Sequence, residues 1–187
     1  MQRQFLRRID KKTDYKQRLA LLKSGIPRIV VRKSTSNIHV QIIKYERNGD
    51  RTVLEDVSSN LKKLGWKAHC SNIPAGYLIG YKVGKNALII GIKEAVADIG
   101  LQNSTKENII YAVLKGIKDS GIDINIGDAV PDDAKIKGSH ISSYAKLLKK
   151  DKNIFEKQFS LYLKNNMDPE NIEKHFDEIK EKIQKMV

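Results

Sequence analysis

The chain has 187 residues, of which 40% are hydrophobic, 35 are Lys or Arg and 22 are Asp or Glu, so its formal net charge is +13. One core and a small appendage fit this length. A single cysteine, Cys70, excludes an intramolecular disulfide framework, and the longest run without a charged residue, 68–81, has 14 residues and is too short to span a bilayer as a helix. We therefore expect a cytoplasmic protein with no membrane partner.

The positive charge is concentrated near the start of the chain. Residues 1–33 contain eleven Lys or Arg and two Asp, a net +9 (11 − 2), whereas the other 154 residues contribute +4 (24 − 20). This pattern is typical of a segment that binds a polyanion. A solubilising tail is the alternative, but this segment is interleaved with Phe5, Leu6, Ile9 and Tyr15. Charged residues also interrupt any apolar run of a secretory signal.

Residues 1–12 form a basic arm that we expect to be poorly ordered alone, since its charges repel and it has little to bury. A short helix follows in TDYKQRLALLKSG, with Thr13 as its N-cap and Ser24-Gly25 as its end.

A pattern of β-strands comes next. Residues 28–33, 37–45 and 51–57 are rich in β-branched side chains. Asn48-Gly49 between the last two predicts a hairpin, because both turn residues can adopt positive φ. Three strands this close in the chain predict an antiparallel meander.

The next predicted elements are a helical turn at 58–64, ended by Gly65, and a helix from Asn72-Ile73-Pro74 to about Gly91. The helix carries three glycines four residues apart: Gly76, Gly80 and Gly84. We interpret this row as tight packing on the sheet; a contact ridge for a partner is the alternative.

Residues 94–100 read as a fourth strand, which is reached by a helical crossover and so should lie parallel to a neighbour. A strongly amphipathic helix follows, with a capping box at Ser104 and Glu107 and an end at Gly121. Its expected buried stripe is Ile110, Val113, Leu114 and Ile117. A polar loop, 122–138, then leads to a helix at 139–148.

The last forty residues are two amphipathic helices, the second capped by Asp168, opened by Pro169 and lined by Ile172, Phe176, Ile179 and Ile183. We expect this apolar stripe to pack on a neighbour. The predicted fold class is α/β, an antiparallel β-meander plus a parallel strand with packed helices, in the order of the ribonuclease-H-like topology. The expected divisions are a basic arm (1–12), an α/β RNA-binding domain (13–148) and a C-terminal helical extension (149–187).

No catalytic pattern is present. GYKVGKN has one residue too few between its glycines for a phosphate-binding loop and Asn86 in place of Ser or Thr, and the four histidines lack zinc-ligand spacing. Ribonuclease-H-like enzymes use several convergent acids, but residues 28–45 contain none before the turn and Asp98 stands alone. We expect no cofactor, no metal and no small-molecule substrate.

Several polar side chains beyond the arm suit RNA. Arg28, Arg32 and Lys33 lead into Ser-Thr-Ser-Asn at 34–37, whose small polar groups fit phosphates and 2′-hydroxyls. His39 and Gln41 share one face of a strand. Trp66 beside Lys67 offers a base-stacking site, with core packing as the alternative.

Several ordered blocks, KTDYKQRLALLKSGIPRIVVRKSTSNIHVQI, SSNLKKLGWKAHCSNIPAGYLIG, AVADIGL, AVLKGIKDSG and GSHISSYAKLL, resemble one family over roughly residues 3–148. It is the archaeal and eukaryotic branch of the large-subunit ribosomal protein that binds 5S ribosomal RNA (number eighteen in archaeal and bacterial nomenclature, five in eukaryotic). The chain departs from the family pattern at Lys11, where Gly is frequent, and within Asn72–Gly80.

The resemblance implies a non-enzymatic constituent of the large ribosomal subunit. It would bind 5S ribosomal RNA (5S rRNA) and help attach it to 23S ribosomal RNA (23S rRNA) in the central protuberance, beside other large-subunit proteins. The side chains expected to contact RNA are Arg3, Arg7, Arg8, Lys11, Lys12, Thr13, Tyr15, Lys16, Arg18, Arg28, Arg32, Lys33, Ser34, Asn37, His39, Gln41, Ser58, Trp66, Lys67 and Asn72.

Two other functions use the same features. A ribonuclease-H-like nuclease would show magnesium-dependent cleavage that Asp98→Asn abolishes. A general DNA-binding or membrane-surface protein would prefer duplex DNA or anionic vesicles to structured RNA.

Overall fold

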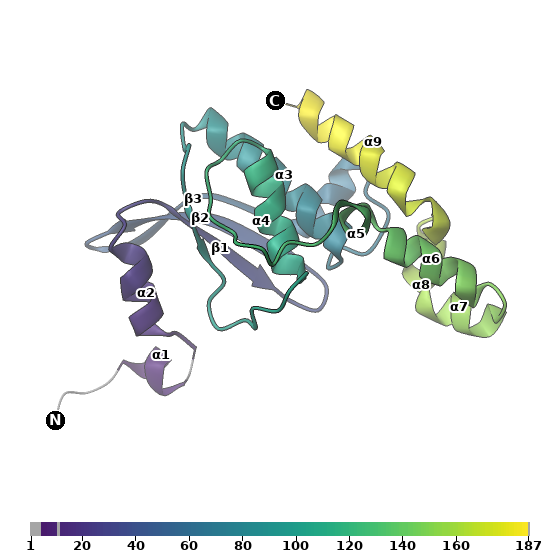
Figure 1. Ribbon diagram of the computed structural model, residues 1–187, viewed down its shortest axis with the longest axis horizontal. Coiled ribbons are helices and arrows are strands. Elements are labelled where there is room, and N and C mark those ends of the chain that lie inside the picture. Colours follow the sequence, from purple (N-terminus) through teal and green to yellow (C-terminus); the bar gives the residue numbers. More distant parts are fainter. Residues whose placement is uncertain (1–4, 11, 187) are drawn as a thin grey trace.

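The computed structural model describes residues 5–10 and 12–186. A mixed four-stranded sheet is formed by β1 (Arg28–Lys33), β2 (Ile38–Glu46), β3 (Gly49–Val57) and β4 (Val96–Asp98). The strand order is β3-β2-β1-β4. The pairs β1–β2 and β2–β3 are antiparallel, and β4 is parallel to β1. Figure 1 shows β1, β2 and β3 side by side. The predicted meander, the parallel fourth strand and the α/β fold class are confirmed.

The helices are α1 (Leu6–Ile9), α2 (Tyr15–Leu22), α3 (Ile73–Ile89), α4 (Ile109–Asp119), α5 (Asp133–Lys137), α6 (Ser139–Leu148), α7 (Lys152–Gln158), α8 (Ser160–Lys164) and α9 (Ile172–Lys185). Two 3₁₀ helices, η1 (Ser58–Leu64) and η2 (Pro169–Asn171), complete the described elements. As predicted, η1 ends at Gly65, which has a positive φ of 100°.

The hairpin between β2 and β3 forms where it was predicted, but with a different turn. Glu46 pairs with Gly49, so Arg47 and Asn48 are the two turn residues. Of the residues Asn48 and Gly49, only Gly49 has a positive φ, 141°. The expected turn with positive φ at both residues is therefore wrong, because Gly49 already belongs to the ladder.

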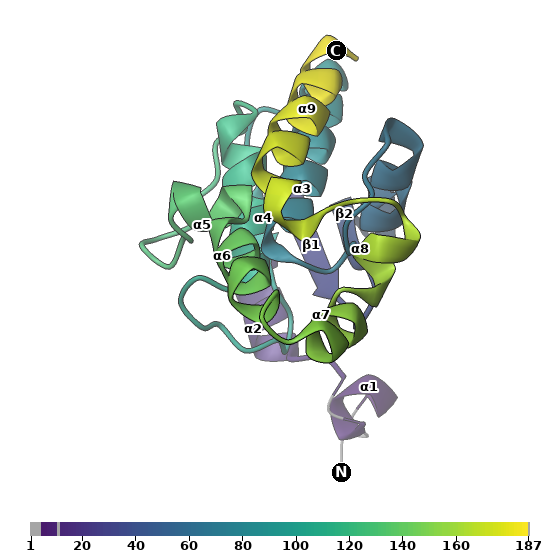
Figure 2. The same cartoon turned by 90° about the vertical axis from the view of Figure 1, so that its right-hand side faces the viewer.

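One face of the sheet, the inner face, is covered by α3 and α4. Its side chains are fully buried: Ile29 and Val31 of β1, and Ile38, Val40 and Ile42 of β2. Figure 2 shows α9 on the side of α3 that faces away from the sheet. Helix α3 therefore lies between the sheet and α9. The hydrophobic core thus runs from the sheet through α3 to α9.

The glycine row of α3 packs on α4, not on the sheet as predicted. A Cβ at Gly80 would clash with the backbone of Val113, and one at Gly84 with Ser120. A reciprocal glycine on α4, Gly116, lies against the backbone of Tyr77. The two helices approach at backbone distance because each lacks side chains along the contact.

The predicted capping box of α4 is wrong. The helix begins five residues after Ser104, with Asn108 as its N-cap, and Glu107 has a positive φ of 58°. Glu107 instead forms an ion pair with Lys135. The expected buried stripe is confirmed, since its four members are between 0% and 2% exposed: Ile110, Val113, Leu114 and Ile117.

The segment predicted as a polar loop, 122–138, contributes to the core. Ile122, Ile124 and Ile126 are buried in alternation with exposed residues, and Asp123 forms a parallel bridge with Glu94. The segment then forms α5. The three isoleucines alternate with other residues, which is the pattern of a strand. The acidic residues of the segment led instead to the prediction of a polar loop.

At the C-terminal end, the first predicted helix is divided into α7 and α8 at Phe159. Asp168 caps the next segment as expected, through a bond from the Glu170 backbone N–H, and Pro169 opens η2, which leads into α9. The four predicted stripe residues of α9 are buried, with the Phe176 ring 5.6 Å from that of Tyr77. Helix α9 thus packs within the same chain, on α3, α5 and α6.

Candidate nucleic-acid interface

The basic segment folds back on itself at α1 and α2. Arg7 Nε donates to Thr13 Oγ1 at 3.0 Å, and the Phe5 and Tyr15 rings lie 5.0 Å apart. The N-cap of α2 is Asp14, whose Oδ1 accepts from the N–H groups of Lys16 and Gln17. Thr13 as the N-cap is therefore a wrong prediction, because the carboxylate one residue later reaches the free amides.

An ion network links α2 to the outer face of the sheet, which is the face opposite α3 and α4. Asp50 Oδ2 accepts from Arg18 at 2.9 Å and from Arg28 at 2.7 Å. Asp98 accepts from Arg28 at 2.8 Å and from Arg32 at 3.1 Å. Three guanidinium groups thus alternate with two carboxylates along the outer face.

Arg28 is the central member of this network. Its side chain is 3% exposed, and both terminal nitrogens are held by carboxylates. Its Nε has no hydrogen-bond partner among the residues that the structure describes. A buried guanidinium without these acids would be strongly unfavourable, so the network holds Arg28 in place and fixes the position of α2.

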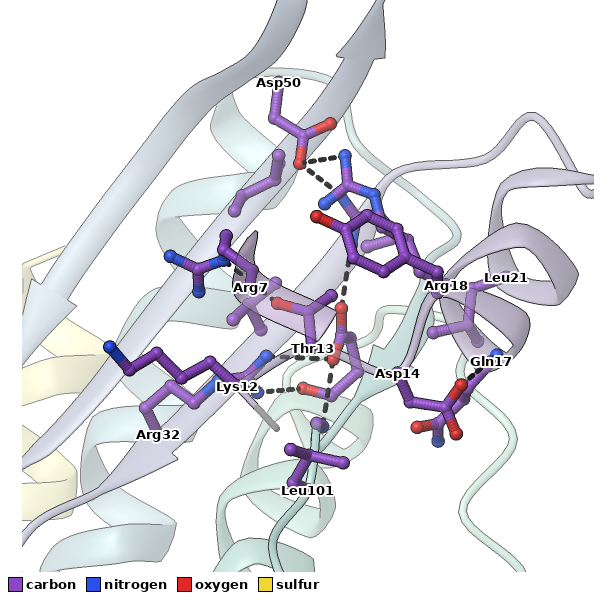
Figure 3. A pocket seen from close by; sticks show the side chains of 16 residues that line it. Arg7, Lys12, Thr13, Asp14, Gln17, Arg18, Leu21, Arg32, Asp50 and Leu101 are labelled. Carbon is purple, nitrogen blue, oxygen red and sulfur yellow. Dashed lines mark hydrogen bonds and ion pairs between the residues drawn. The ribbon is translucent and has the colours of Figure 1, made fainter. Parts of the chain in front are cut away.

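A cleft of about 390 Å³ lies between the α1–α2 segment and the outer face. Figure 3 shows Arg7, Lys12 and Arg32 on one side of it, opposite Asp14 and Gln17. Its lining combines cationic, acidic and apolar side chains with one glycine: Arg7, Lys12, Thr13, Asp14, Tyr15, Gln17, Arg18, Leu21, Arg28, Val30, Arg32, Ile43, Asp50, Asp98, Gly100 and Leu101. At Gly100, φ is 61° and a Cβ would meet the Arg32 guanidinium, so glycine admits that side chain.

The end of the sheet beside the cleft presents polar groups. The turn between β1 and β2 is closed by bonds between Ser34 and Asn37, including Ser34 N–H to the Asn37 carbonyl at 2.8 Å. Lys33 and His39 are exposed, whereas Gln41 Nε2 donates to Glu55 at 2.9 Å. The predicted common face of His39 and Gln41 is confirmed, since they lie opposite Arg32 and Val30 of β1.

Four predicted contact residues have structural roles instead. Arg28 is enclosed in the ion network, and Ser58 is fully buried with its Oγ accepting from the Ile38 N–H. Trp66 is 2% exposed and stacks on His175 at 5.1 Å, so the core alternative holds. Asn72 caps α3 by accepting from the Ala75 N–H and also donates to the Tyr162 hydroxyl. In this fold, the first three are too buried to contact RNA.

The remaining predicted residues fall into three groups. Arg3 and Lys11 lie outside the described residues. Exposed residues are Arg7, Arg8, Lys12, Lys16, Lys33, Ser34, His39 and Lys67. Partly exposed residues are Thr13, Tyr15, Arg18, Arg32, Asn37 and Gln41. The α2 helix and the ends of β1 and β2 bring most of them to one side, whereas Lys67 lies beside α9, where its N–H donates to His175.

Sequence reasoning missed the acids of the network and the apolar lining of the cleft. Asp50 is 22 residues from Arg28 and Asp98 is 70 residues from it. The parallel pairing places Asp98 beside Val30, between Arg28 and Arg32 on the same face. The contacts of Asp98 with the two arginines can therefore be predicted only when the register between β4 and β1 is known.

No group of three or more His, Cys, Asp or Glu side chains in the described part of the chain has the arrangement to hold a metal ion. None of the helices described is both long and apolar enough to cross a membrane.

Comparison with known proteins assigns the chain to a family. Residues 1–93 match the model of the ribosomal large subunit proteins 60S L5 and 50S L18. The large ribosomal subunit protein uL18 of Methanococcus maripaludis is 46% identical over 180 residues, which cover 96% of this chain and 93% of that protein. The chain belongs to the uL18 family.

Membership of the uL18 family makes the protein a structural constituent of the large ribosomal subunit, which confirms the predicted family and location. The similarity to the archaeal relative extends through almost the whole chain, so it includes most of the C-terminal helices as well as the sheet.

Proposed function

We propose that this protein binds 5S rRNA and helps attach it to 23S rRNA in the central protuberance of the large subunit. The observation that carries the proposal is the gathering of exposed cations around the cleft on the outer face. Arg7, Arg8, Lys12 and Lys16 come from the N-terminal segment, and the partly exposed Arg32 comes from β1. Such a surface suits a polyanion, and membership of the uL18 family makes ribosomal RNA the relevant one.

The proposed contacts divide by chemistry. The exposed Lys and Arg side chains neutralise phosphates and release counterions, which supplies affinity without sequence information. The polar groups of the β1–β2 turn and of His39 offer contacts to 2′-hydroxyl groups and base edges. Recognition of one RNA would then depend on the fixed spacing between the sheet and α2, which the Arg18–Asp50 contact sets.

The revised contact set omits Arg28, Ser58, Trp66 and Asn72, which have structural roles in the fold. Within the residues that the structure describes, it retains the other exposed and partly exposed members of the predicted set. Arg18 and Arg32 are retained with only part of their donors available, because both are held by acids.

Binding of purified protein to 5S rRNA and to an unrelated RNA duplex of equal length tests the proposal. We expect clearly tighter binding to 5S rRNA at physiological salt. If about six cations of the segment 1–33 each neutralise one phosphate, the slope of log affinity against log salt is roughly −4 to −5. Equal affinities for the two RNAs would contradict specific recognition.

We propose no catalytic role. The nuclease alternative needs Asp98 as a metal ligand, but both of its carboxylate oxygens are bound by arginines, Oδ2 by Arg28 and Oδ1 by Arg32. These two cationic neighbours also oppose binding of a divalent cation at Asp98.

A further inference from the structure

The cleft between α2 and the outer face has two chemically distinct parts. One part is apolar and is formed by Leu21, Val30, Ile43 and Leu101, side chains that come from four different segments. The other part is cationic and includes Arg7 and Lys12, the two exposed cations of the α1–α2 segment that line it. Tyr15 also contributes to the lining, and its ring packs on Phe5.

The acids in the cleft do not cancel this positive character. Asp50 and Asp98 are each paired with two arginines. Asp14 accepts two backbone N–H bonds at the start of α2. The lining carries five cations and three acids, a net +2 (5 − 3). Outside the lining, Asp10 pairs with Lys12 at 3.3 Å between two exposed side chains, and solvent weakens such a pair. Arg7 and Lys12 therefore remain available to one phosphate.

We propose that the cleft receives a single unstacked nucleotide of the bound RNA, with its base on the apolar part beside Tyr15 and its phosphate at Arg7 and Lys12. This inference rests on the proposed function. About 390 Å³ is at the lower end of the range of roughly 300–1,000 Å³ for small-ligand sites, which suits one nucleotide and not a folded RNA segment. Bases splayed from loops and bulges are the usual basis of sequence-specific RNA recognition.

Filling the cleft without changing its charge tests the proposal. Gln17 lines the cleft from α2, so Gln17→Trp places an indole where the nucleotide would lie. Ala20→Trp is the matched control, because Ala20 is exposed on the same helix and is not among the lining residues. Both variants and the wild type are titrated with 5S rRNA, and the chemical reactivity of each RNA nucleotide is measured in the three complexes.

We expect Gln17→Trp to weaken 5S rRNA binding about tenfold or more and to restore the reactivity of one nucleotide that the wild type protects. Ala20→Trp should bind within about twofold of the wild type with that nucleotide still protected. Thermal unfolding checks that each variant is folded. If Gln17→Trp is unstable, Leu101→Trp fills the cleft from its other wall and carries the same expectation.

Wild-type affinity and an unchanged footprint for the folded cleft-filling variant would overturn the cleft proposal and leave 5S rRNA binding intact. Weaker binding without the change at one nucleotide, or equal weakening by Ala20→Trp, would also overturn it. Absence of any preference of the wild-type protein for 5S rRNA would instead overturn the proposed function itself.

Discussion

The two faces of the sheet are formed by alternate residues of the same strands, and they differ in burial and charge. On β1, Ile29 and Val31 point to the inner face and are fully buried beneath the helices, whereas Arg28 and Arg32 belong to the outer face. On β2, Val40 is buried and its neighbour His39 is exposed. The inner face is an apolar core, and the outer face is a set of charges arranged around a cleft.

This contrast shows that positive charge in a sequence has two uses. Arg28 stabilises the fold by forming ion pairs with Asp50 of β3 and Asp98 of β4. Arg7, Arg8 and Lys16 are exposed, and their charge is available to a partner. Net charge alone does not separate these roles, because a buried arginine and an exposed arginine count equally.

Removing an acid of the outer face should have the largest effect on the fold. Asp98→Ala removes one partner from the buried Arg28 and one from the partly exposed Arg32. Because Arg28 then keeps only Asp50, we expect the unfolding free energy to fall by about 3–5 kcal/mol. Urea denaturation measures it. The control Glu46→Ala breaks only an exposed pair with Arg51 and should cost less than about 1 kcal/mol. Equal losses in the two variants would contradict a structural role for the network.

On the inner side, Gly80→Ala tests the close approach of α3 and α4. Alanine favours the helix by about 1 kcal/mol over glycine, but the added Cβ would overlap the Val113 carbonyl. We expect a net destabilisation of about 1–3 kcal/mol in urea denaturation. Gly76→Ala should cost less, because its nearest neighbour is a side-chain methyl group of Ile109 at 3.1 Å. A stabilised Gly80→Ala variant would refute this packing.

Neutralising exposed cations should change binding and leave the fold intact. For Arg7→Gln with Arg8→Gln, we expect the salt slope of 5S rRNA binding to flatten by about 1.4–1.8, with unfolding free energy within about 0.5 kcal/mol of wild type. Lys118→Gln with Lys174→Gln removes the same charge from exposed positions on α4 and α9. Its slope should not change. Identical slopes for the two double variants would argue against a localised interface.

The smallest expected effect is a dependence of stability on pH. Burial lowers the pKa of His175, and its Nε2 accepts the Lys67 N–H at 3.1 Å, a bond that requires the unprotonated ring. Because the folded pKa lies below the unfolded value of about 6.5, this stabilisation is present above pH 6.5 and is lost as pH falls through the folded pKa.

Urea denaturation between pH 7.5 and pH 5 measures this dependence. His175→Gln should show a shallower loss of stability on acidification than wild type. His69 and His140, whose pKa values burial also lowers, stay in both proteins, so part of the loss should remain. An equally steep loss in the variant would show that His175 does not contribute.

Periodicity predicted most of the fold because it reports burial directly. The alternation at Ile38, Val40 and Ile42 and the helical stripe from Ile110 to Ile117 both lie where apolar residues repeat at a fixed interval. The start of α4 was predicted wrongly because of a contact with a distant residue. Ser104 and Glu107 have the spacing of a capping box, but Glu107 is drawn to Lys135, a contact 28 residues away.

Fewer features of the candidate site than of the fold could be predicted from the sequence. Charge clustering indicated the exposed residues of the N-terminal segment, but it also included Arg28, whose acids lie in other strands. Trp66 next to Lys67 has the same local pattern whether a base or His175 stacks on it, and the partner comes from α9. Both errors concern contacts between distant segments, which local patterns do not contain.

Chemical modification of lysines with and without 5S rRNA tests most directly whether the outer face is the RNA-binding side. Acetylation followed by mass spectrometry compares Lys12 and Lys16 of the N-terminal segment, beside the outer face, with Lys118 and Lys174 on the helical side, all of which are exposed in the free protein. We predict that 5S rRNA protects the first two and leaves the other two unchanged. Protection of Lys118 and Lys174 with continued modification of Lys12 and Lys16 would contradict this assignment.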